Sequence, residues 1–149
     1  MEQYKEFINK CDFIEYDVSK KDIKDTLLKN NLAMDICRNT ISEEAIVDIL
    51  ESDEINGYIA VMDGKYIGFV FYKQNYDTFY LSLIATLPKL GFPLGQMLLT
   101  MFEEEAKNKQ AIDIQASAVV DVIDFYTNRN YEIVYLDRDC QEYSIRKKL

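Results

Sequence analysis

Histidine is absent from this sequence of 149 residues, and the three cysteines, Cys11, Cys37 and Cys140, are widely spaced without a Cys-x-x-Cys pair. Zinc sites are built from histidine and closely spaced cysteine, so the sequence predicts that the protein holds no metal. No Cys-His pair can form either, which argues against a nucleophilic cysteine. We expect three reduced, partly buried thiols in a reducing compartment.

The sequence also lacks any apolar run near the ~20 residues that a membrane-spanning helix requires. The first eleven residues are charged and amphipathic, and they lack the apolar core of a signal peptide. We therefore expect a cytoplasmic protein with no membrane partner. With 48% hydrophobic residues, a chain of this length is expected to form one domain over residues 1–149.

Basic residues are scarce: 17 lysines and arginines stand against 26 aspartates and glutamates, a formal net charge of −9. Nucleic-acid-binding proteins use Lys and Arg to displace counterions from phosphates, so we expect no nucleic-acid partner. An acidic surface favours a cationic small molecule or peptide, such as a polyamine, an aminoglycoside or a lysine-bearing peptide. Acidity also serves solubility alone, and both interpretations stay open. A homodimer is compatible with the sequence.

Local patterns predict an α/β layered domain with a mixed sheet. Ser19 and Ser42 are the predicted N-caps of the first two helices, and Asp63-Gly64 favours a type I′ hairpin turn. Residues 103–105 are expected to face solvent. The predicted elements are strand 12–18, a helix after 19, a helix after 42, strands 58–62, 65–72 and 78–85, a helix from about 94, strand 111–116, helix 119–127, and strands 131–135 and 142–146.

The most informative stretch runs from Leu87 to Leu99, out of the third strand of the meander and into an amphipathic helix. A strand that passes through a glycine-bearing turn into a helix directs backbone N–H groups toward one point. The positive end of the helix dipole lies there too. This transition can hold a pyrophosphate without any basic side chain.

The element order and this loop resemble the GNAT superfamily of acyl-CoA-dependent N-acetyltransferases, over nearly the whole chain from Asp12 onward. The family loop, Gln/Arg-x-x-Gly-x-Gly/Ala, falls on the six residues 90–95, and paired leucines follow at 98 and 99. Gly95 matches outright, whereas Leu90 replaces Gln/Arg and Pro93 replaces the first signature glycine. Proline has no N–H, so one phosphate donor is missing.

The resemblance implies a GNAT-like fold: a central mixed, mostly antiparallel sheet of about six to seven strands with about four flanking helices. It also implies acetyl-CoA as co-substrate, with the pantetheine arm beside the third meander strand and the pyrophosphate on the loop. The implied cofactor-binding residues are Leu83, Ile84, Ala85, Leu90, Gly91, Phe92, Pro93, Leu94, Gly95 and Gln96.

A second motif implies a catalytic tyrosine. Residues 124–131 resemble the end of the family helix Asn-x-x-Ala-x-x-x-Tyr followed by Gly-Phe, with Tyr126 as the tyrosine and Asn130 as a left-handed cap. Val119 and Val122 stand where the family has Asn and Ala. In the family this tyrosine lies near the thioester sulfur and returns a proton to the thiolate. The alternative for Tyr126 is a purely structural core tyrosine.

Direct attack by an amine needs a base, and family bases are commonly carboxylates on the splayed strand. Asp77, at the entrance of strand 78–85, is the candidate. Glu15 and Asp113 are other strand-borne carboxylates, and we expect both to be solvated.

The sequence thus predicts an enzyme that transfers an acetyl group from acetyl-CoA to a primary amine by direct attack on the thioester. The alternative is a GNAT-fold protein with impaired catalysis that acts as a ligand-binding or protein-interaction module. The residues at Leu90, Pro93 and Val119 favour the alternative, and the strand–loop–helix order, Gly95 and Tyr126 favour the enzyme.

Overall fold

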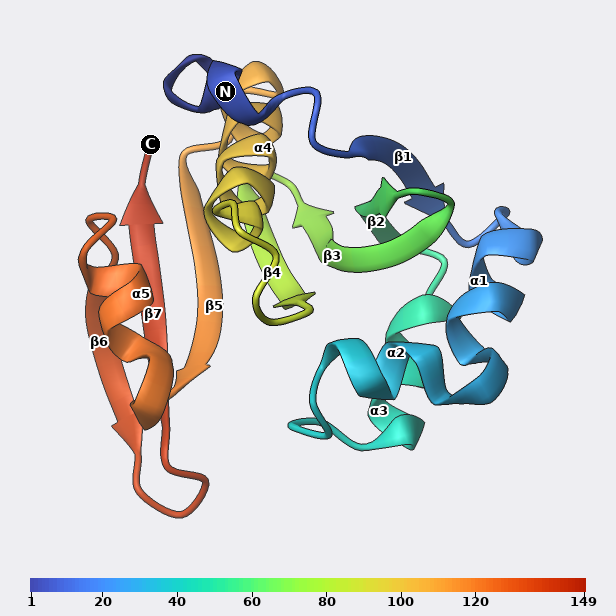
Figure 1. Ribbon diagram of the computed structural model, residues 1–149. Helices are drawn as coiled ribbons and strands as arrows, with labels where there is room; N and C mark the ends of the chain where they lie inside the picture. The colour runs from blue at the N-terminus through green and yellow to red at the C-terminus, as the bar shows by residue number, and fades with distance from the viewer. The chain divides into compact units, whose positions relative to one another are not determined.

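The computed structural model describes residues 1–149 (Figure 1). The elements are η1 (Glu2–Phe7), β1 (Asp12–Asp17), α1 (Lys21–Leu28), η2 (Lys29–Asn31), α2 (Leu32–Ile36), α3 (Glu43–Leu50), β2 (Ile55–Met62), β3 (Lys65–Asn75), β4 (Thr78–Thr86), α4 (Leu94–Asn108), β5 (Asp113–Val119), η3 (Val120–Val122), α5 (Ile123–Thr127), β6 (Glu132–Asp137) and β7 (Glu142–Lys148). None of the helices combines the length and apolar composition needed to cross a bilayer.

The strands hydrogen-bond in the order β1-β2-β3-β4-β5-β7-β6, as one seven-stranded sheet that is mostly antiparallel. β4 and β5 pair in parallel, which makes the sheet mixed. The predicted fold class and element order are confirmed. One difference is that the first predicted helix is divided into α1 and α2, because Asn30 and Asn31 adopt left-handed φ angles of 55° and 59°.

The chain forms two compact units, and β4 and α4 each contribute to both. The first unit comprises residues 1–73 and 82–102, and the second comprises residues 74–81 and 103–149. The expectation of one domain over residues 1–149 stays a prediction.

β3 is buried on both of its faces in the first unit, which explains its nearly continuous apolar run from Ile67 to Tyr72. On one face Phe71 stacks on Phe69 and meets the ring of Tyr16 edge-on at 5.4 Å. This face belongs to a core that also contains Leu27, Ile36, Ile46 and Leu50 of α1, α2 and α3 (Figure 1). On the other face, the ring of Tyr72 packs against the ring of Phe102 of α4, with 5.0 Å between the ring centroids.

The hairpin turn and one of the two caps follow the sequence prediction. Asp63 and Gly64 have φ angles of 53° and 76°, the positive pair of a type I′ turn. The Ser42 hydroxyl accepts the Ala45 N–H and caps α3. The prediction for Ser19 is wrong. Its N–H and hydroxyl both donate to the carboxylate of Asp17, so α1 begins without a side-chain cap.

One other boundary differs from the prediction. Strand β5 continues to Val119, which was expected in a helix, because residues 113–119 pair throughout with β7. The three cysteines are free, as expected, with Cys11 and Cys37 buried and Cys140 exposed.

We predict that Ser42→Ala lowers the free energy of unfolding by about 1 kcal/mol, because the Ala45 N–H at the start of α3 loses its acceptor. The matched control is Ser19→Ala, which removes no helix cap and should cost less than ~0.5 kcal/mol. Urea denaturation monitored by circular dichroism measures both. Equal losses for the two variants would contradict the capping role of Ser42.

Candidate functional site

The loop between β4 and α4 lies in the first unit, and its backbone is held at both ends. At its start, the Leu87 N–H donates to the Ile67 carbonyl of β3 at 2.8 Å. At its end, the Leu94 N–H donates to the Phe92 carbonyl at 2.9 Å, which closes a tight turn around Pro93. Gly91 between them has a φ of +81°, a left-handed conformation that favours glycine. The loop is therefore a defined connection that leads directly into the helix.

Packing against β3 holds the first residue of α4. Leu94 is buried, and its Cδ2 would lie only 2.9 Å from a Cβ added at Gly68. The same Cβ would lie 3.0 Å from the carbonyl oxygen of Ala85 in β4. Only a residue without a side chain at this position of β3 allows the helix start and the end of β4 to approach so closely.

The amino end of α4 leaves two backbone donors for an anion. Met97 donates to the Pro93 carbonyl, Leu94 donates to Phe92, and Pro93 has no N–H. The N–H groups of Gly95 and Gln96 remain, because the first N–H groups of a helix have no acceptor within it. The first turn contains no acidic residue to repel an anion. The Gln96 side chain accepts a hydrogen bond from the Tyr4 hydroxyl at 3.1 Å.

β4 extends beyond the last residue that pairs with β5. The parallel ladder ends at Leu81–Ala116, whereas β4 continues to Thr86 and β5 continues to Val119 with β7 as its partner. Leu83, Ile84 and Ala85 follow the last pair and are half-buried. The structure thus brings the predicted cofactor-binding residues of β4, the loop and the start of α4 into one unit.

Tyr126 belongs to the second unit, at the buried face of α5. Its ring meets Phe125 and Tyr131 edge-on, at centroid distances of 5.1 and 5.5 Å. Burial raises the pKa of Tyr126 to about 12, so the phenol stays protonated at neutral pH. Asn130 has a φ of 68°, the left-handed conformation that the motif predicted, and the Tyr131 N–H returns to the Tyr126 carbonyl.

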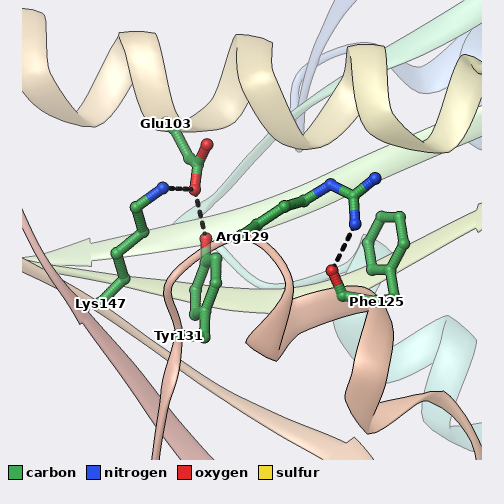
Figure 2. Close-up of polar contacts among 5 residues, drawn as sticks. All are labelled: Glu103, Phe125, Arg129, Tyr131 and Lys147. Atoms are coloured by element: carbon green, nitrogen blue, oxygen red, sulfur yellow. Dashed lines mark hydrogen bonds and ion pairs between the residues drawn. The ribbon is translucent and has the colours of Figure 1, made fainter.

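Glu103 of α4 organises the surroundings of Tyr131 (Figure 2). One oxygen, Oε2, accepts from the Tyr131 hydroxyl and from Lys147 Nζ, each at 2.9 Å. The Glu103 and Lys147 side chains are only 13% and 19% exposed, so the expectation that Glu103 faces solvent is wrong. Burial and the Glu103 charge raise the pKa of Tyr131 well above its usual range. Sequence reasoning missed this residue because it stands in a run of three glutamates.

Arg129 closes the other side of α5. Its guanidinium lies 4.2 Å from the centre of the Phe125 ring and donates to the Phe125 carbonyl near the end of the helix (Figure 2). A cation at this end also opposes the negative end of the helix dipole. The short helix that carries Tyr126 is therefore held from both sides.

The structure does not bring Asp77 and Tyr126 together. Asp77 is exposed in the β3–β4 turn, and its carbonyl accepts the Ile112 N–H just before β5. Tyr126 follows the other end of β5, whose seven residues span roughly 20 Å. Asp113 is buried rather than solvated, because it accepts from Thr78 Oγ1 and Gln115 Nε2. Asp77 as the base stays a prediction.

No protein-family model matches the sequence, and no curated protein matches it. Solved structures do match. The acetyltransferase from Streptococcus agalactiae has a TM-score of 0.72 and 17% identity, over 95% of this chain and 100% of the other. The PaiA N-acetyltransferase from Thermoplasma acidophilum, in complex with coenzyme A, has a TM-score of 0.67 and 16% identity, over 93% and 99%. An aminoglycoside 6′-acetyltransferase of type Ii has a TM-score of 0.69 and 18% identity, over 92% and 96%.

These structural neighbours define a class, the acetyltransferases and acyl-CoA N-acyltransferases. This chain shares its fold with these neighbours, one of which is described as a member of the GNAT family, and the fold is the one that the sequence resemblance predicted. The match at these levels of identity concerns the fold.

We predict that Glu103→Gln lowers the free energy of unfolding by about 1–3 kcal/mol, because Lys147 and Tyr131 lose a partly buried charged acceptor. The control on the same helix is Glu105→Gln, whose ion pair with Lys109 is more exposed and should contribute less than ~1 kcal/mol. Chemical denaturation of both variants tests the difference. A cost for Glu103→Gln no larger than that of the control would show that the negative charge of Glu103 adds no stability.

Proposed function

We propose that the protein transfers an acyl group, in the first instance acetyl, from acyl-CoA to a primary amine. The observation that carries the proposal is the arrangement of the first unit: an end of β4 beyond the β4–β5 ladder, followed by a tight loop and the open amino end of α4. That arrangement occurs in a fold whose structural neighbours are acyltransferases, one of them solved with coenzyme A.

In this proposal the pyrophosphate of CoA is held by the N–H groups of Gly95 and Gln96 at the start of α4, where the helix dipole is positive. The Leu94 N–H is already used by Phe92, so the loss of a donor at Pro93 is not offset by its neighbour. The pantetheine arm would run along Leu83, Ile84 and Ala85, using the backbone groups of β4 beyond its last pair with β5.

The reaction needs two proton transfers. The amine nitrogen attacks the thioester carbon, the C–S bond breaks, a base takes one proton from nitrogen, and the thiolate accepts another. Tyr126 is the proposed partner of the thiolate. With a pKa of about 12 it is a weak acid but a persistent hydrogen-bond donor, suited to stabilising the departing thiolate as charge develops. Asp77 is the candidate base from the sequence, but it lies at the opposite end of β5 from Tyr126, so in this proposal the nitrogen loses its proton to water.

The acceptor is proposed to be a small or peptidic amine. The net charge of −9 favours the approach of a cation, and one structural neighbour is named as an aminoglycoside acetyltransferase. We propose that the protein acts in the cytoplasm, without nucleic acid or a membrane as partner. A homodimer is compatible with this proposal.

We predict that Gly95→Leu weakens acetyl-CoA binding by more than about tenfold, because a side chain in the first turn of α4 obstructs the approach of the phosphates. Leucine is a better helix former than glycine, so the variant should fold. Isothermal titration calorimetry measures the affinity. Lys89→Gln, which removes the lysine of the exposed loop, is the control and should matter less.

Two results would contradict this. Unchanged affinity for Gly95→Leu would place the phosphates elsewhere on the protein. Absence of any acetyl-CoA binding by the wild-type chain would remove the proposed function altogether.

We predict that Tyr126→Phe lowers the acetyl-transfer rate by roughly ten- to a thousandfold, because only the hydroxyl is lost. The phenyl ring still packs against Phe125 and Tyr131, so affinity for acetyl-CoA should change little. Turnover and thermal melting are measured on the same preparation. Full turnover together with a lower melting temperature would assign Tyr126 a structural role, and leave protonation of the thiolate to water.

A further inference from the structure

One face of the second unit's strands carries two rows of polar side chains. The cross-strand register aligns Tyr80 of β4 with Gln115 of β5 and Arg146 of β7. Two residues along, on the same face, Ser117 of β5 is aligned with Ser144 of β7. The alternate residue Lys147 reaches Glu103 of α4, so these rows lie on the face turned away from that contact.

A cavity of about 290 Å³ lies over these rows. It is lined by Tyr80, Leu81, Gln115, Ala116, Ser117, Val134, Ser144, Ile145 and Arg146. Its lining residues carry three hydroxyls, an amide and a guanidinium, and none of them is acidic. Its volume is near the lower end of the range of small-molecule sites, which suits a ligand about the size of an amino acid.

Arg146 is the charged group of this cavity, and its N–H donors lack good acceptors within the protein. Its Nε is buried and has no hydrogen-bond partner. The nearest carboxylate, on Glu132, is 4.0 Å from Nη2, and that side chain is 64% exposed. An ion pair this long and exposed contributes little, whereas an unsatisfied buried donor is costly.

Asp113, on the same face of β5 as Gln115, makes no hydrogen bond or ion pair with Arg146. Its two oxygens accept from Thr78 and from the amide of Gln115, and the Gln115 amide is thereby turned toward Asp113. The guanidinium is thus left as a cation with unused donors beside two serine hydroxyls. A carboxylate has a planar pair of oxygens that matches a guanidinium, and it suits a ligand of amino-acid size in this cavity.

We propose that this cavity binds the carboxylate of a small amino-acid-like amine, with Arg146 as its principal contact. The identity of this amine as the acyl acceptor rests on the proposed function, whereas the carboxylate site itself does not. Along β4, Leu81 of the cavity is two residues before Leu83, the first residue of the proposed pantetheine segment. The acceptor is then recognised by a local positive charge, although the whole protein is acidic.

The test compares L-lysine with L-lysinamide, which differ in the carboxylate alone, by calorimetry with and without saturating CoA. The proposal predicts that lysine binds at least about tenfold more tightly. The net charge of −9 by itself predicts the opposite order, because lysinamide and polyamines such as spermidine carry more positive charge.

Arg146→Gln should abolish the preference for lysine. Arg146→Lys should retain only part of the preference, because lysine keeps the charge but lacks the planar, paired N–H donors of arginine. Arg138→Gln makes the same charge change at an exposed residue of the β6–β7 turn and should keep the preference. Melting temperatures show whether each variant is folded, and the comparison of the two ligands on the wild type needs no variant.

Equal or reversed affinities, a preference that survives Arg146→Gln, or no lysine binding in either condition would each overturn the proposal. Acetyl-CoA binding is measured separately on the same preparation. A chain that binds acetyl-CoA without preferring lysine retains the proposed function and loses the carboxylate site.

Discussion

The candidate site depends on the point at which the β4–β5 hydrogen bonding stops. Up to Leu81–Ala116 the two strands form a parallel ladder, and beyond it each continues without the other. A strand that leaves its partner exposes backbone N–H and C=O groups, and these must find other acceptors and donors. An extended ligand with amide groups of its own can supply them, and pantetheine is such a ligand. The end of the ladder thus leaves a stretch of β4 whose edge is available for the extended ligand of the proposed function.

The start of α4 follows from the same region. Gly68 lets Leu94 and the end of β4 approach β3, and the turn around Pro93 then sets the direction of the helix. This turn leaves fewer backbone N–H groups for a ligand, because Pro93 has no N–H and the Leu94 N–H is bonded within the turn. The turn that fixes this loop therefore also reduces the number of its free N–H groups. An anion held here relies on the helix dipole more than on the loop itself.

The charges around individual sites in this protein differ from its net charge. The overall excess of acidic residues says little about the second unit, where Glu103 is shared by Lys147 and Tyr131 on one face. On the opposite face Arg146 lies in a cavity without an acidic lining residue. Alternation along β7 separates these two environments, because adjacent residues of a strand point to opposite faces. Net charge acts on an approaching ligand at long range, whereas local groups such as these act at contact distance.

The sequence by itself determined the order of elements, the hairpin turn at Asp63-Gly64 and the cap at Ser42, because these depend on periodicity and on contacts between near neighbours. It also located the loop before α4 and the left-handed Asn130. Only the tertiary structure decided which carboxylates are buried or partly buried. Glu103 and Asp113 look solvated in sequence, yet each is bonded to residues at least 28 positions away. The hydrogen bonding and burial of a side chain depend on long-range packing, which local patterns do not record.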